Sequence, residues 1–127
     1  MSAETNALNW FEIPANDMQQ SQKFYETIFD MQMQPMDMPG MKMAMFPWSA
    51  EQAKVGGAVV QSQMHVPSGT GPIVYLNANP DLQSVLNKVE KAGGNILMPK
   101  TRIDENSGYM ALIKDIEGNT IGLHSNG

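Results

Sequence analysis

The sequence predicts an α+β fold in which two βαβββ modules form a curved mixed sheet, with helices on the outer face and a cup on the inner face. The order strand, helix, strand, strand, strand occurs twice along the chain. The 127 residues suit one domain. We divide them into module one at about residues 7–62, a loop at 63–71 and module two at about 72–125. At one constant offset, Met18, Gln22, Tyr25 and Met33 align with Leu82, Leu86, Val89 and Leu97.

Module one begins with a strand-like stretch from Ala7 to Ala15, in which Trp10 and Glu12 share a face. Asp17 suits the N-cap of a helix that runs from Met18 to about Phe29. The residues expected on the buried side of this helix are Met18, Ser21, Gln22, Tyr25 and Phe29. The strands expected next are Met31 to Gln34, Met41 to Phe46 around a Pro39-Gly40 turn, and Gly56 to Gln61.

Module two repeats these elements. Its first strand is expected over Pro72 to Ala78, and Pro80-Asp81 opens a helix that reaches about Ala92, where two glycines end it. The remaining strands are expected at Asn95 to Lys100, Gly108 to Asp115 and Thr120 to Ser125. The acidic pair in "DIEGN" fits a tight hairpin, in which the glycine allows a positive φ, better than a catalytic pair.

Composition excludes several classes of function. The chain has no cysteine, which rules out disulfides and thiolate chemistry. Thirteen acidic and eight basic residues give a net charge of −5, which argues against nucleic acid as a partner. No apolar run approaches the ~20 residues needed to cross a bilayer, so no membrane partner is expected. The first ten residues lack the features of a signal peptide, and we expect a cytoplasmic protein.

Four segments together carry a family resemblance: "FEIPANDMQQSQKFYETIFDMQM", "VGGAVVQ", "VEKAGGNILMPK" and "DIEGNTIGLHS". The chain resembles the vicinal oxygen chelate superfamily, which includes glyoxalase I, bleomycin-resistance proteins and extradiol dioxygenases. The resemblance covers about Leu8 to Ser125. Within the superfamily, the chain is similar to an uncharacterised glyoxalase-related branch with "FEIP" near the start and "EGN" before the last strand.

The resemblance implies four positions for metal ligands, which are typically His, Glu, His and Glu in metal-using relatives. These positions fall on Trp10, within Val55 to Gln61, near Pro72 or Val74, and on Gly122. None of them carries a nitrogen, sulfur or carboxylate donor of the kind that zinc or iron requires. We therefore predict no metal and no cofactor, and the metal-dependent activities of the family do not transfer to this chain.

Glu12 and His124 are the candidate catalytic residues. Strand alternation places Glu12 on the face of Trp10 and His124 on the face of Gly122, which the resemblance identifies as the interior of the cup. A carboxylate and an imidazole in one apolar pocket with Trp10 can transfer protons. Alternatively, Glu12 bonds a neighbouring strand and His124 is half solvated. His65 lies in the loop, where we expect it to be exposed and without a role.

The candidate ligand-binding residues are aromatic or methionine side chains: Trp10, Met43, Met45, Trp48, Tyr75 and Tyr109. Ordinary core packing competes with this interpretation for each of them. The sequence leaves open whether the methionine-rich strands line the cup or pack under the helices.

These features predict a small-molecule-binding protein with an aromatic and methionine-lined cup that acts as a metal-independent enzyme. The alternatives are a non-catalytic protein that sequesters a ligand, as bleomycin-resistance proteins do, and a domain that acts through a protein partner. An acidic chain with aromatic residues suits a cationic or planar ligand. Open sheet edges predict a homodimer.

Overall fold

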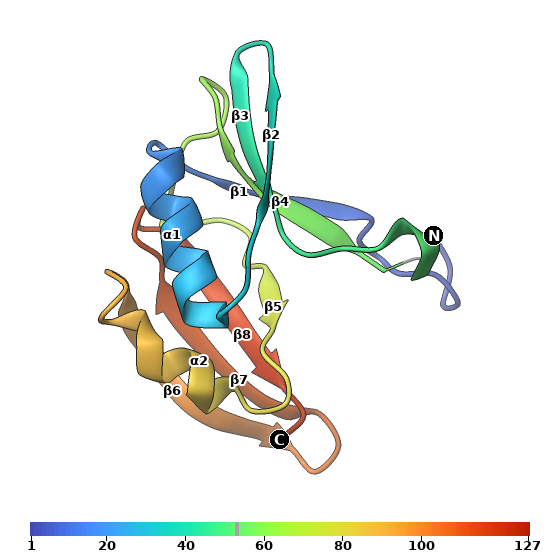
Figure 1. The fold of residues 1–127 in the computed structure, drawn as a ribbon. Helices are drawn as coiled ribbons and strands as arrows, with labels where there is room; N and C mark the ends of the chain where they lie inside the picture. Colours follow the sequence, from blue (N-terminus) through green and yellow to red (C-terminus); the bar gives the residue numbers. More distant parts are fainter. Residues whose placement is uncertain (53) are drawn as a thin grey trace.

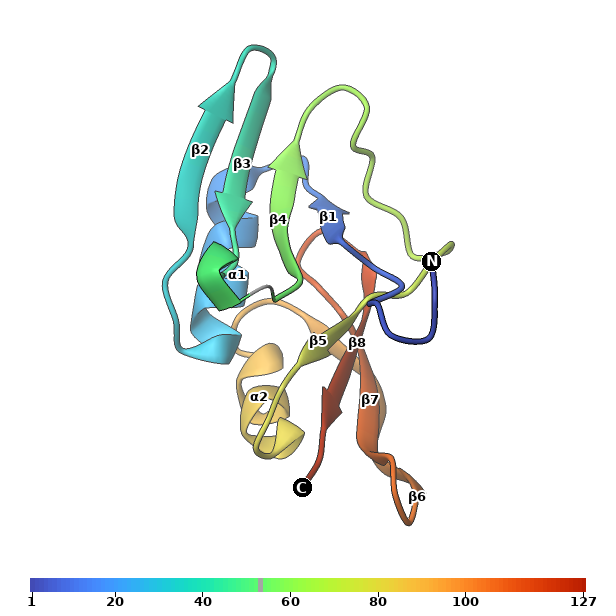
Figure 2. The ribbon, with the colours of Figure 1, turned by 90° about the vertical axis from the view of Figure 1, so that its right-hand side faces the viewer.

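The computed structural model describes residues 1–52 and 54–127. It contains two four-stranded sheets, each with one helix on the same side (Figures 1 and 2). The first module consists of β1 (Trp10–Pro14), α1 (Met18–Phe29), β2 (Gln34–Met38), β3 (Met41–Met45), the short 3-10 helix η1 (Ala50–Gln52) and β4 (Gly56–Gln61). The second consists of β5 (Tyr75–Asn77), α2 (Leu82–Val89), β6 (Asn95–Asp104), β7 (Gly108–Lys114) and β8 (Thr120–Ser125).

The two modules have the same topology, which confirms the predicted α+β class with two βαβββ units. Sheet A has the strand order β1-β4-β3-β2 and sheet B the order β5-β8-β7-β6. In each sheet the first strand pairs parallel with the last, with Trp10 opposite Gly56 in sheet A and Tyr75 opposite Gly122 in sheet B. The two sheets stay separate, since no strand pairing among the described residues joins sheet A to sheet B.

Helix α1 begins and ends at the residues that its local signals predict. The Asp17 side chain accepts a hydrogen bond from the Gln20 backbone N–H, as an N-cap does. Asp30 ends the helix in the left-handed conformation, with φ of 49°. The predicted buried side was partly wrong, because α1 packs against α2 as well as sheet A, and Phe24 and Ile28 are buried in place of Gln22 and Phe29. The buried residues are Met18, Ser21, Phe24, Tyr25 and Ile28.

Several strand boundaries differ from those predicted. The chain leaves α1 through residues 31–33 rather than entering a strand at once, because the Glu26 carboxylate accepts the Met33 backbone N–H at 2.8 Å. Strand β5 is shorter than predicted. Strand β6 continues to Asp104 and pairs with β7 through three shifts in register.

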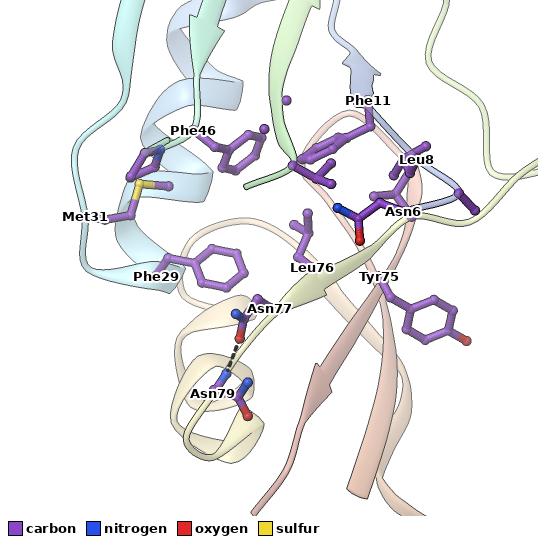
Figure 3. A pocket seen from close by; sticks show the side chains of 16 residues that line it. Asn6, Leu8, Phe11, Phe29, Met31, Phe46, Tyr75, Leu76, Asn77 and Asn79 are labelled. Carbon is purple, nitrogen blue, oxygen red and sulfur yellow. Dashed lines mark hydrogen bonds between the residues drawn. The ribbon is translucent and has the colours of Figure 1, made fainter. Parts of the chain in front are cut away.

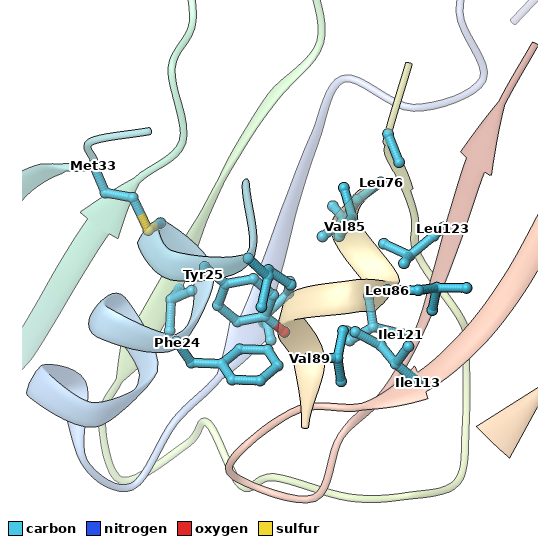
Figure 4. Packing of buried hydrophobic residues seen from close by; sticks show 14 of the residues in the cluster. Phe24, Tyr25, Met33, Leu76, Val85, Leu86, Val89, Ile113, Ile121 and Leu123 are labelled. Atoms are coloured by element: carbon cyan, nitrogen blue, oxygen red, sulfur yellow. The ribbon is translucent and has the colours of Figure 1, made fainter. Parts of the chain in front are cut away.

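The main core lies between the helices and the sheets, and residues of both modules contribute to it (Figure 4). A second, smaller cluster lies on the other face of sheet A. It consists of Met43, Ala58 and Val60, with Trp10, Met41 and Met45 packed against them. The alternating methionines of β3 therefore face away from α1, which resolves the alternative that the sequence left open.

The β7–β8 turn is the hairpin that the sequence predicts, with Gly118 at φ of 90°. It also joins the two modules. The buried Asp115 carboxylate accepts the Tyr25 hydroxyl of α1 at 2.7 Å and the Asn119 side-chain amide at 2.9 Å. Asn119 in turn donates to the Pro14 carbonyl at the end of β1, at 2.8 Å.

The same turn also contacts the two residues before α1. One oxygen of Glu117 accepts the backbone N–H groups of Asn16 and Asp17 at 2.8 and 2.6 Å. A helix leaves its first N–H groups without partners inside the helix, and a carboxylate there is favoured by the helix dipole. Module two therefore supplies part of the cap of the helix in module one.

No helix in the described ranges has both the length and the apolar character needed to cross a membrane.

We expect Asp115→Ala to lower the free energy of unfolding by about 3 kcal/mol or more, because it leaves several buried donors without an acceptor. Asp104→Ala is the matched control. Asp104 also accepts two backbone N–H groups in a turn, but it is exposed and both donors belong to its own turn. Urea denaturation followed by circular dichroism measures both variants. Equal losses would show that the Asp115 bonds do not hold the modules together.

Burial, and then the neighbouring Asp115 carboxylate, hold the pKa of Tyr25 well above its ordinary value. Above about pH 10 the unfolded chain loses the tyrosine proton while the folded chain keeps it. The stability from this group is therefore complete below pH 10 and is lost as pH rises towards the folded-state pKa.

We expect the unfolding free energy of the wild type to fall more steeply than that of Tyr25→Phe in urea titrations between pH 9 and 11. The variant should already be about 1–3 kcal/mol less stable at neutral pH, since Asp115 loses a donor. If the unfolding free energies of the wild type and the variant fell in parallel with pH, the loss of stability would not come from Tyr25.

Candidate functional site

The candidate site lies on the face of sheet A that is turned away from α1. We call it the open face and define it by Trp10 and Glu12 of β1, Met41, Met43 and Met45 of β3, and Ala58 and Val60 of β4. Strand alternation places these side chains together, since every second residue of a strand points to the same side. The open face is thus an apolar, methionine-rich surface with one carboxylate at its edge.

A row of hydrogen-bonded side chains lies along the rim of the open face. The Trp10 indole Nε1–H donates to one Glu12 oxygen at 3.3 Å, and the other oxygen lies 2.8 Å from His65 Nε2. The remaining His65 nitrogen, Nδ1, lies 2.6 Å from the Ser62 hydroxyl. The side chains of His65 and Glu12 are 17% and 35% exposed. The expectation that His65 is exposed was therefore wrong.

The partners of His65 fix its tautomer when the imidazole is neutral. An ionised carboxylate only accepts hydrogen bonds, so Nε2 carries the hydrogen that faces Glu12. Nδ1 is then the acceptor, and the Ser62 hydroxyl donates to it. The Ser62 oxygen also accepts the backbone N–H of Met64 at 3.1 Å. The row therefore places a base next to a hydroxyl and orients that base with a carboxylate.

His124 does not join this row, and the predicted pocket of Trp10, Glu12 and His124 is not formed. His124 lies in sheet B, where it is opposite Asn77 of β5, and its Nε2 lies 2.6 Å from the Ser107 carbonyl. Glu12 belongs to sheet A, and no strand pairing among the residues that the structure describes connects the two sheets. The loop that follows β4 returns to β1, so the histidine that meets Glu12 is His65.

The other predicted ligand-binding residues separate into two groups. Met43, Met45 and Trp10 belong to the open face, and Trp48 lies beside them with its ring centroid 6.2 Å from that of Trp10. Tyr75 and Tyr109 belong to sheet B. Tyr109 packs partly against the main core and lies under the Lys100 ammonium group, which is 4.4 Å from the ring centroid. The structure therefore does not bring all six together.

β1 and β5 end in the same way, because the alanine after each strand, Ala15 or Ala78, still donates its backbone N–H to the neighbouring strand. Counting back from these alanines aligns Trp10 with Ile73, which lies between the two positions that the sequence left open. The parallel partners of Trp10 and Tyr75 are both glycines, Gly56 and Gly122.

Aromatic rings cover both glycines. A Cβ atom added to Gly56 would lie 2.8 Å from the Trp48 ring, and one added to Gly122 would overlap the Tyr75 ring. Within residues 1–52 and 54–127, no group of three or more His, Cys, Asp or Glu side chains could hold a metal ion. The residues present do not fit the metal site that the fold implies, because rings occupy the space into which ligand side chains would project.

Two cavities adjoin these residues. One of about 430 Å³ is lined by Trp10, Met45 and Trp48, together with the segments 32–34 and 46–47. A larger cavity of about 630 Å³ lies between the modules and has an apolar wall formed mainly by Phe11, Phe29, Phe46, Val74 and Leu76 (Figure 3). Of the candidate ligand-binding residues, only Tyr75 lines this larger cavity.

The family model of the Glyoxalase/Bleomycin resistance protein/Dioxygenase superfamily matches residues 7–123. Among curated proteins, no sequence matches significantly. The chain is similar in structure to the trypanothione-dependent glyoxalase I of Leishmania major, with a TM-score of 0.67 and 16% identity over 96% of this chain and 88% of that one.

Two further solved structures are similar. One is the fosfomycin resistance protein FosX of Listeria monocytogenes, with a TM-score of 0.64 and 10% identity over 97% of this chain and 93% of that one. The other is glyoxalase I of Zea mays, with a TM-score of 0.66 and 17% identity over 93% of this chain. The chain spans only 44% of the maize enzyme. At these identities the likeness shows the fold alone.

Proposed function

This chain belongs to the Glyoxalase/Bleomycin resistance protein/Dioxygenase superfamily, and from that premise we propose that it is a metal-independent enzyme that binds a small organic molecule on the open face of sheet A. Its proton-transfer pair is Glu12 with His65. The observation that carries the proposal is the hydrogen-bonded row Trp10–Glu12–His65, which lies at the rim of an apolar surface. A protein that only sequesters a ligand does not need an imidazole oriented in this way.

The composition of the open face indicates the ligand class. Three methionines and the Trp10 ring favour a planar or apolar body, and methionine adapts to ligands of different shape. Glu12 is the only ionisable residue among those that define the open face, and its carboxylate lies beside the Trp10 ring. A carboxylate and an indole together attract a positive charge. The proposed ligand is therefore planar and carries a cationic or hydrogen-donating group next to Glu12.

Methionine methyl groups allow a direct test of this site. We expect N-methylquinolinium, a planar cation, to shift the methyl resonances of Met41, Met43 and Met45 in protein labelled with [methyl-13C]methionine. Its neutral isostere 1-methylnaphthalene should bind more weakly to the wild type, and Glu12→Gln should remove the difference. Met98, which lies in β6 of sheet B and outside the open face, is the internal control.

Trp10→Ala should abolish these shifts and leave the fold intact. Shifts confined to Met31 would place binding in the cavity between the modules, and no shifts at all would contradict the proposed site.

We also propose a homodimer. Support comes from large apolar side chains at or near sheet edges that one chain leaves exposed, among them Met38, Tyr75 and Leu97. The whole of β2, an edge strand of sheet A, is exposed, and an open edge is a template for pairing. We expect light scattering at micromolar concentration to give twice the mass of one chain. A monomer mass at every concentration would contradict the homodimer without affecting the proposed ligand site.

A further inference from the structure

We propose that Ser62 is a nucleophile and that the substrate class is a small carboxylic ester or thioester, whose acyl group passes through Ser62 to water. This inference rests on the proposed function, because it uses the same Glu12–His65 pair and names the substrate that the pair would act on. A nucleophile, a base within hydrogen-bond reach and a third group that orients the base form the arrangement on which acyl transfer by serine depends.

The distances along the row suit transfer of the hydroxyl proton. Ser62 Oγ lies 2.6 Å from His65 Nδ1, and His65 Nε2 lies 2.8 Å from Glu12. The two imidazole nitrogens are exchanged relative to the common serine–histidine–aspartate arrangement. The chemistry requires only that the nitrogen lone pair faces the hydroxyl and that the opposite N–H faces the carboxylate. Both conditions are met here.

The chain holds Ser62 in a fixed position. It follows the last residue of β4 directly, and its oxygen accepts the Met64 N–H, which limits rotation of the hydroxyl. The backbone N–H of His65 donates to the Ser62 carbonyl at 3.3 Å, so one turn carries both the nucleophile and the base. Glu12 reaches His65 from β1, a different strand of the sheet.

A second serine in the same loop shows which part of this arrangement is unusual. Ser68 Oγ also accepts the N–H of the residue two positions later, Thr70, at 3.1 Å. The side-chain partner of Ser68, however, is the Thr70 hydroxyl rather than an imidazole. The turn alone therefore does not bring a histidine to a serine, and Ser68 provides a matched control.

The reaction balances without a metal or a redox partner. The Ser62 oxygen attacks the carbonyl carbon of the ester while its proton passes to His65 Nδ1. The bond from that carbon to the leaving oxygen or sulfur breaks, and His65 returns the proton to the leaving group. A water molecule then attacks the acyl-serine by the same route, which releases the carboxylic acid and restores the Ser62 hydroxyl.

The surroundings of Ser62 can receive a small acyl group. Ser62 lines a cavity of about 480 Å³ together with the segments 15–16, 37–38, 40–42 and 61–63. Met38 and Met41 provide apolar contacts there, and the lining also includes the oppositely charged residues Asp37 and Lys42, which pair with each other between β2 and β3.

The absence of cysteine from the chain allows a test that needs no knowledge of the natural substrate. We expect the single thiol of Ser62→Cys to react with 5,5′-dithiobis(2-nitrobenzoate) at pH 7 at least tenfold faster than the single thiol of Ser68→Cys. Adding His65→Gln to Ser62→Cys should remove this advantage, because a neighbouring imidazole base favours the reactive thiolate. Equal rates at the two positions would overturn the proposal.

A second measurement uses the native serine. We expect a fluorophosphonate to add once to the wild type and to Ser68→Ala, with peptide mass spectrometry locating the adduct on Ser62, and not to add to Ser62→Ala. Glu12→Gln should slow the labelling. Wild-type protein that is not labelled, or is labelled elsewhere, would overturn the proposal.

The methionine resonances separate the two possible failures. If N-methylquinolinium still shifts Met41, Met43 and Met45 while Ser62 is unreactive, the acyl-transfer inference alone fails. If those shifts are absent as well, the proposed function fails with it.

Discussion

The carboxylate of Asp115 is the group on which the arrangement of the two modules depends. It is buried, and it accepts hydrogen bonds from its own turn, from Tyr25 of α1 and from Asn119. A buried carboxylate is stable only when hydrogen bonds replace the water it has lost, so each partner is needed. Because these partners come from both modules, the Asp115 carboxylate holds helix α1 to the turn between β7 and β8. The shared core then packs around that contact.

The same turn also determines where the proposed chemistry lies. The Asn119 side-chain amide donates to the Pro14 carbonyl, and its oxygen accepts the Ser68 N–H at 3.0 Å. Asn119 therefore anchors the end of β1, two residues after Glu12, and the loop from residue 63 to 71, three residues after His65. One side chain of module two thus holds both segments that bring the Glu12 carboxylate and the His65 imidazole together at the rim of the open face. Thr120 adds a second anchor to the loop through the Gly69 carbonyl.

Local signals in the sequence were sufficient for the fold but not for the site. Met18–Phe29 could be predicted as a helix because Asp17 caps it within three residues. The pairing of Glu12 with His65 could not, since it joins residues far apart in sequence through a loop without periodicity. Tyr25 and Asp115 present the same difficulty. Strand alternation correctly placed Glu12 with Trp10 and His124 with Gly122, but it could not show that these pairs lie on separate sheets.

The internal repeat explains why Glu12 and His124 do not meet. The register places Glu12 opposite Ala58 in sheet A and, at the equivalent level, Tyr75 opposite Gly122 in sheet B, whereas His124 lies opposite Asn77. The two modules are alike in backbone, and each has a glycine that is covered by an aromatic ring. Trp48 covers Gly56, and Tyr75 covers Gly122. They differ in charge, because a tyrosine, Tyr75, stands where module one has Glu12. A repeated scaffold therefore carries its carboxylate–imidazole pair in one module only, where a loop returning to β1 supplies the histidine.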